Sequence, residues 1–230
     1  MPAKPKKRAR LARPWTVALL AAALGALALA GAAAADKEKI HLTAEGQAAA
    51  RAAVLKRADL GAATGWKGGA RKPDLSSTPP CESFRPKQSD LVLNGAAETR
   101  WTHPGVQIDT EAQVLQTAQM VRLDWQRTVL SPKVLPCLRE AIAKSLDAKT
   151  HLVSLRHLAF PRVATYTRAY RALMDVDAPT GSVRVLSDVV VVGRGRTELT
   201  LTTTAPFAAE ALVRQSELRL ARLLASRIRA

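Results

Sequence analysis

Apolar and polar residues alternate through much of the second half of the chain, and this period of two is typical of β-strands. It predicts strands over residues 152–160, 164–176, 182–192 and 196–204. Gly193-Arg194-Gly195 predicts a hairpin between the last two, since glycine readily adopts the positive φ of a tight turn. In the final strand we expect Leu199 and Leu201 to point into the core and the threonines that alternate with them to point outward.

Apolar residues recur at helical spacing in four other segments, which predict helices over residues 43–58, 117–130, 133–147 and 207–229. Two further strands are expected over 89–101 and 106–116, and the Gly- and Pro-rich residues 59–88 are expected to form a loop. Strands joined by short turns pair antiparallel, and helices cover their apolar face. The pattern therefore predicts an α+β fold, with an antiparallel sheet of about six strands flanked by helices, in two layers or a sandwich.

The first 35 residues have the organisation of an export signal. Residues 1–13 carry six Lys and Arg and no acid, residues 15–35 are almost entirely apolar, and the alanines at 33–35 match a cleavage site. The apolar stretch is also long enough to span a bilayer if it is not cleaved. We therefore expect a signal peptide or N-terminal membrane anchor, followed over residues 36–230 by one secreted or extracytoplasmic domain.

The two cysteines, Cys81 and Cys137, both lie in the part expected to be exported. An even count of cysteines in an oxidising compartment predicts a disulfide. A metal site would need more ligands at short spacing, and the four histidines form no such pattern with the cysteines. We expect a structural disulfide that tethers the long loop to the helix over 133–147.

The exported part keeps an excess of positive charge. Removing residues 1–35 leaves 29 Lys and Arg against 19 Asp and Glu, so the formal net charge falls from +16 to +10. A positive surface favours anionic partners such as wall polymers, although composition alone also produces such an excess. Nucleic acid is not expected as a partner, because the Arg-rich segment 207–229 lacks interleaved aromatic residues.

The chain contains no familiar catalytic motif. It lacks a G-x-S-x-G elbow, an H-E-x-x-H pair and a Walker-type phosphate loop. We therefore expect a non-catalytic protein without a cofactor. A secreted hydrolase whose catalytic residues are scattered along the sequence is the alternative.

Large aromatic residues are the candidates for lining a ligand cleft, because they combine apolar area with a polar group. These candidates are Trp66, Trp101, Trp125, Tyr166 and Tyr170. The same residue types also fill ordinary cores. Arg194 and Arg196 flank the predicted hairpin and are candidates for contact with an anion, or for a charged edge that resists aggregation.

A series of short sequences, together with Cys81 and Cys137-Leu138, carries a family resemblance. The series is Asp59-Leu60, Gly65-Trp66, Ser89-Asp90-Leu91-Val92, Trp125-x-Arg127-x-Val129, Phe160-Pro161-Arg162 and Val190-Val191-Val192-Gly193-Arg194-Gly195-Arg196-Thr197. In this order they resemble actinobacterial exported proteins related to extracellular sensor domains of receptor serine/threonine kinases and to cell-wall lipoproteins of PsbP-like fold. The resemblance implies an antiparallel sheet flanked by helices, with a cleft for a cell-envelope ligand.

These observations together lead us to expect an exported, sensor-like binding domain for an envelope lipid, polymer or protein. A second hypothesis is that the protein binds anionic wall polymers electrostatically through the Arg-rich segment 207–229. A third hypothesis is the secreted hydrolase described above.

Overall fold

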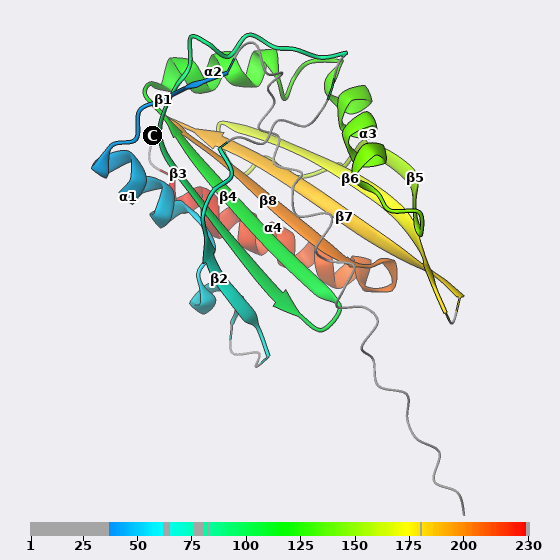
Figure 1. The fold of residues 1–230 in the computed structure, drawn as a ribbon. Helices are drawn as coiled ribbons and strands as arrows, with labels where there is room; N and C mark the ends of the chain where they lie inside the picture. The colour runs from blue at the N-terminus through cyan, green and yellow to red at the C-terminus, as the bar shows by residue number, and fades with distance from the viewer. Residues whose placement is uncertain (1–36, 62–64, 76–80, 82, 180, 229–230) are drawn as a thin grey trace, which may run out of the picture.

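The computed structural model describes residues 37–61, 65–75, 81, 83–179 and 181–228. Within them lie one mixed sheet of eight strands, four α-helices and two short 3-10 helices (Figure 1). The predicted α+β class and the largely antiparallel pairing are confirmed. The expected signal or anchor over residues 1–35 lies outside the described residues. Among those described, no helix has both the length and the apolar character to cross a membrane.

The sheet has the strand order β1-β3-β4-β8-β7-β6-β5, and β2 pairs with β3 beside this path. All pairs are antiparallel except the short parallel pair of β1 with β3. The strands are β1 (Lys39–Ile40), β2 (Lys67–Arg71), β3 (Val92–His103), β4 (Val106–Leu115), β5 (Thr150–His157), β6 (Tyr166–Ala178), β7 (Gly181–Arg194) and β8 (Thr197–Pro206).

The sheet is larger than the about six strands predicted, because two strands pair with β3 without showing a strand pattern. β1 has only two residues. β2 lies inside the segment 59–88 that was expected to be loop, and its sequence Lys-Gly-Gly-Ala-Arg has no apolar alternation. Gly68 adopts φ 130°, and a Cβ atom there would lie 2.0 Å from the carbonyl oxygen of Arg100 on β3. This pairing therefore depends on glycine and not on buried side chains.

Four helices cover the sheet on both faces. α4 (Glu210–Arg227) and α1 (Ala44–Ala53) lie against one face, and α2 (Ala118–Arg127) and α3 (Val134–Ser145) lie over the other (Figure 1). Threonine hydroxyls that accept backbone N–H groups begin both α1 and α2. The molecule therefore has three layers, where the sequence predicts two layers or a sandwich.

Alternation along each strand divides the apolar residues between two cores. Leu199 and Leu201 on β8 pack toward α1 and α4, as expected. Thr202 and Thr204 point to the opposite face, but both are buried, at 5% and 7% exposure. The expectation that these threonines face solvent is wrong, because the second face of the sheet is also enclosed.

A disulfide and an ion pair are among the links that attach the α2/α3 layer to the rest of the molecule. The predicted disulfide between Cys81 and Cys137 is present, and it ties the segment before β3 to the first turn of α3. At the end of α2, Arg127 donates two hydrogen bonds to the carboxylate of Asp90, at 2.6 and 3.0 Å. These links position both helices over the second face of the sheet.

Candidate functional site

The sheet separates the five aromatic candidates into two groups. Trp101 packs on the α1/α4 face, where its indole N–H donates to the carbonyl oxygen of Leu55 at 3.3 Å, and Trp66 packs against the same core. The other three candidates, Trp125, Tyr166 and Tyr170, lie on the α2/α3 face. The structure therefore brings together three of the five residues.

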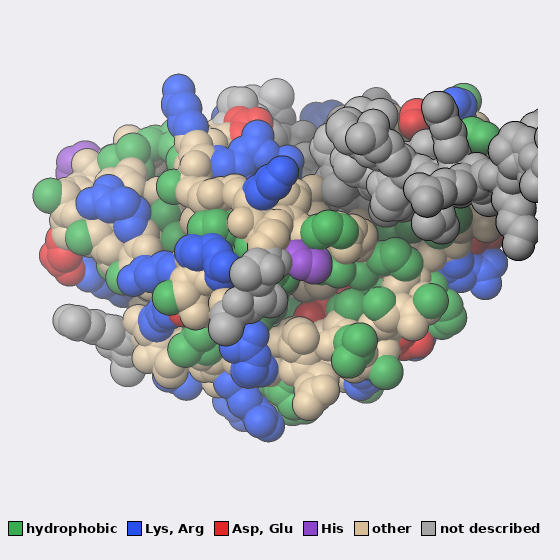
Figure 2. Space-filling view, turned by 90° about the horizontal axis from the view of Figure 1, so that it is seen from below, with side chains coloured by type: hydrophobic (Ala, Val, Ile, Leu, Met, Phe, Trp, Pro, Cys, Tyr) green, Lys and Arg blue, Asp and Glu red, His purple; other side chains and the backbone are tan. Residues whose placement is uncertain are grey.

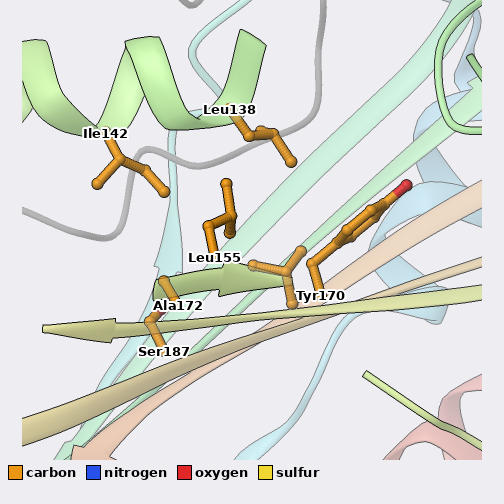
Figure 3. Close-up of a pocket in the computed structure, with 7 residues that line it drawn as sticks. Leu138, Ile142, Leu155, Tyr170, Ala172 and Ser187 are labelled. Carbon is orange, nitrogen blue, oxygen red and sulfur yellow. The ribbon is translucent and has the colours of Figure 1, made fainter. Parts of the chain in front are cut away.

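A small apolar cavity lies between α3 and the sheet (Figure 3). Its volume is about 10 Å³, which is room for about one water molecule. Leu138 and Ile142 of α3 point toward the sheet across it. The strands contribute the remaining lining residues, Leu155, Tyr170, Ala172, Ser187 and Val189. We call this cavity the α3 slot.

Polar side chains continue from the floor of the α3 slot across the same face of the sheet. Ser187 is 1% exposed, and its hydroxyl lies 3.3 Å from the Thr204 hydroxyl on the next strand. Beyond this pair, alternate residues of β3, β4 and β8 stand in register on this face. We call them the polar strip: Glu98, Arg100, Gln107, Asp109, Glu111, Thr200, Thr202 and Thr204.

Hydrogen bonds within the polar strip orient its side chains. Asp109 accepts from Gln107 Nε2 at 2.6 Å and forms an ion pair with Arg100 on the neighbouring strand. Glu111 accepts from Gln113 Nε2 at 2.9 Å. The strip thus presents hydroxyl, amide, carboxyl and guanidinium groups in a fixed arrangement.

The carboxyl groups of the polar strip lie in a region that opposes negative charge. Burial raises the pKa of Glu111 to about 7, although the hydrogen bond from Gln113 acts in the other direction. Burial also raises the pKa of Glu98 and of Asp109, and for Asp109 it outweighs the ion pair with Arg100. A ligand that brought further negative charge here would therefore be disfavoured.

A second group of acids lies where the polar strip meets α2. Asp124 accepts from Gln88 Nε2 at 2.8 Å and from the Thr128 hydroxyl. Burial, followed by the charge of Asp124, raises the pKa of Glu198 well above its usual range, and the same two causes raise the pKa of Glu38 to about 7. Further negative charge is therefore disfavoured at that end of the strip as well.

The two arginines proposed for anion contact both bind other parts of the chain. Gly195, with φ 54°, forms the predicted hairpin turn between them. Arg194 donates to the carbonyl oxygen of Ala225 in α4 at 3.2 Å, and Arg196 donates to the Glu45 carboxylate at 2.6 Å. Elsewhere, Lys and Arg side chains are spread over the face seen in Figure 2, among neutral and apolar groups.

Within the described part of the chain, no group of three or more His, Cys, Asp and Glu residues has the arrangement of a metal site. No protein-family model matches the chain. No curated protein matches it at a significant level. The fold and the side chains themselves therefore carry the functional interpretation.

Sequence reasoning missed Ser187 and the whole polar strip. The strip follows a period of two that is visible in the sequence, since Thr200, Thr202 and Thr204 occupy alternate positions of β8, and Gln107, Asp109 and Glu111 occupy alternate positions of β4. In a two-layer sheet such positions face solvent. The signal that could have identified them is the pair of helices predicted over 117–130 and 133–147, which need a sheet face to cover.

Proposed function

We propose that this protein is an exported binding domain for an amphiphile of the cell envelope with an uncharged, hydroxyl-rich head group. The observation that carries the proposal is the continuity between the apolar α3 slot and the polar strip, through the contact of Ser187 with Thr204. Ligand sites typically combine an apolar lining with a few placed polar groups. The resemblance to extracellular sensor domains leads to the same class of function.

The α3 slot is the site proposed for the apolar part of the ligand. Its walls are the side chains of Leu138, Ile142, Leu155 and Val189. As it stands the slot holds only about one water, so an alkyl chain enters as α3 moves outward. The disulfide at Cys137 holds the first turn of α3 and leaves the rest of the helix attached by packing.

The polar strip is the site proposed for the head group. Hydroxyls both donate and accept hydrogen bonds, and the threonines, Gln107 and Asp109 offer both partners. An anionic head would approach carboxyls whose pKa is already raised by burial. These features favour a neutral sugar-like head over a phosphate.

Calorimetric titration with two amphiphiles of equal chain length tests this specificity. An alkyl glucoside and an alkyl phosphate are each titrated below the concentration at which they form micelles. We expect the glucoside to bind at least about tenfold more tightly, a difference of about 1.4 kcal/mol. Thr202→Val should weaken glucoside binding because it replaces a hydroxyl with a methyl group, while Thr165→Val, at an exposed loop position, should leave it unchanged.

Three outcomes would contradict the proposal. Tighter binding of the phosphate, lost at high salt, would favour the electrostatic reading in which anionic wall polymers are the partner. Turnover of a fatty-acid ester by the purified protein would favour the hydrolase. Absence of binding by both amphiphiles would exclude the α3 slot and polar strip as a site for this class of ligand.

A further inference from the structure

Three polar residues lie side by side in the core on the opposite face of the sheet, under α4. Arg171 on β6 pairs in register with Asp188 on β7, and Asp188 pairs with Thr203 on β8. Their exposures are 1%, 0% and 4%. The residues around this row, such as Val190 and Leu201, are apolar. A buried row of this kind needs partners from the helix above it.

α4 places two glutamates over the row, seven residues apart and so on one side of the helix. Glu210 accepts a hydrogen bond from Arg171, which also donates to Asp188 Oδ1 at 2.6 Å. Glu217 is 1% exposed, and neither of its carboxyl oxygens has a hydrogen-bond partner among the described residues. The same holds for the hydroxyl of Thr203.

The cluster therefore contains three carboxyls and one guanidinium. The single positive charge of Arg171 is already shared between Asp188 and Glu210, which leaves Glu217 without a counter-charge of its own. An ionised Glu217 would be buried beside Asp188 without a counter-charge, which is strongly unfavourable. A protonated Glu217 can instead donate a hydrogen bond to Asp188 or Thr203.

The other charged groups packed around α4 do not change this balance. At the far end of the helix, Arg227 pairs with Asp59, and Arg219 donates to the backbone oxygen of Asp59. On the exposed side, Arg214 lies 3.5 Å from the carbonyl oxygen of Ala159. Burial, and after it the charge of Asp188, hold the pKa of Glu217 well above its usual range.

We propose that the attachment of α4 to the sheet depends on one proton carried by Glu217. The folded protein keeps this proton at pH values where the unfolded chain releases it. The stabilisation that Glu217 contributes is therefore fully present near and below the ordinary pKa of a glutamate and falls as the pH rises above it. At alkaline pH, α4 loosens more than α3, whose first turn is held by the disulfide at Cys137.

Urea unfolding of the full chain at a series of pH values tests the inference. The relevant pH range lies between the pKa of Glu217 in the unfolded chain and its higher pKa in the folded protein. Over this range the unfolding equilibrium constant of the wild type, divided by that of Glu217→Gln at the same pH, should rise by up to about tenfold per pH unit. Glu45→Gln, at an acid outside the cluster whose side chain is 78% exposed, is the control and should keep the wild-type slope. An identical pH dependence in wild type and Glu217→Gln would overturn the proposal.

Hydrogen exchange of the wild-type protein gives a second measurement that does not depend on a variant folding. After correction for intrinsic rates, the amides of α4 should lose protection at alkaline pH relative to those of α3. Equal loss in both helices, or none in α4, would overturn the inference. Glu217→Leu, which removes the titrating group and retains an apolar contact, should restore protection of α4.

Discussion

The two helical layers are held to the sheet by different means. α1 and α4 pack through a continuous apolar core that includes Leu220 and Leu224, each at most 1% exposed. α2 and α3 also bury apolar residues, but α3 carries in addition a covalent cross-link, the disulfide at Cys137. Ion pairs occur in both layers, such as Arg127 with Asp90 and Arg227 with Asp59. The α3 slot and the polar strip both lie on the second face.

The comparison shows how one sheet can separate stability from binding. A close-packed face resists any change in volume, and a tethered face can open without loss of the fold. Four sets of substitutions test this difference between the two faces of the sheet. They are ordered from the largest expected effect on stability to the smallest.

Removal of the disulfide should have the largest effect. The bridge closes a loop of 56 residues, and the double variant Cys81→Ser/Cys137→Ser should lose about 4 kcal/mol of unfolding free energy. Denaturant unfolding of the variant and of the oxidised wild type measures this loss. If α3 is tethered as described, its hydrogen exchange should increase more than that of α4. Uniform acceleration across both helices would contradict the comparison.

Truncation of the packed face should come next. Leu224→Ala removes a side chain of α4 that is fully buried in the core, and we expect it to lower the unfolding free energy by about 3 kcal/mol. Leu212→Ala on the same helix is the matched control, because Leu212 is 70% exposed and should change stability by less than about 0.5 kcal/mol. Equal losses in the two variants would show that α4 does not pack as described.

The contact of α1 with β3 is tested by a substitution whose expected effect on stability is opposite to the effect that helix propensity alone predicts. Gly46 lies within α1, where alanine would ordinarily stabilise by about 1 kcal/mol. A Cβ atom at this position would lie 2.3 Å from the carbonyl oxygen of Asn94. We therefore expect Gly46→Ala to destabilise by about 2 kcal/mol in thermal or urea unfolding. A stabilised variant would mean that α1 stands farther from the sheet.

The smallest effect is expected at the ion pair that holds α2. The hydrogen bonds from Arg127 lower the pKa of Asp90 to about 2. The folded state therefore favours the ionised form, and this stabilisation is complete above the ordinary aspartate pKa and is lost as the pH falls toward 2. Because both side chains are partly exposed, Asp90→Asn should cost only about 0.5–1 kcal/mol at neutral pH. Urea unfolding at acid and neutral pH should show this difference shrinking at low pH.

The sequence predicted the helices and the longer strands because their apolar residues recur with a clear period. The predicted helix over 133–147 and the structure's α3, Val134–Ser145, agree closely. The disulfide was also predictable, because the chain has two cysteines and a segment with the organisation of an export signal. In both cases the physical cause lies within a short stretch of sequence or in a simple count.

The candidate site could not be predicted in the same way. Whether Trp101 and Trp125 share a cleft depends on which face of the sheet each one meets, and the sequence does not specify the layers. Glu217 lies at a position of the last helix where the pattern calls for an apolar residue. Its contact with Asp188 depends on the packing of α4 against β7, which the sequence pattern does not specify. Properties of this kind depend on the register between distant strands.

Methyl NMR of the purified protein, titrated with an alkyl glucoside below its micelle concentration, tests the proposed site most directly. The predicted result is that methyl signals of Leu138, Ile142 and Val189 around the α3 slot shift on titration, while those of Leu220 and Leu224 on the opposite face stay in place. Shifts confined to Leu220 and Leu224, or no shift at any of these methyl groups, would contradict it.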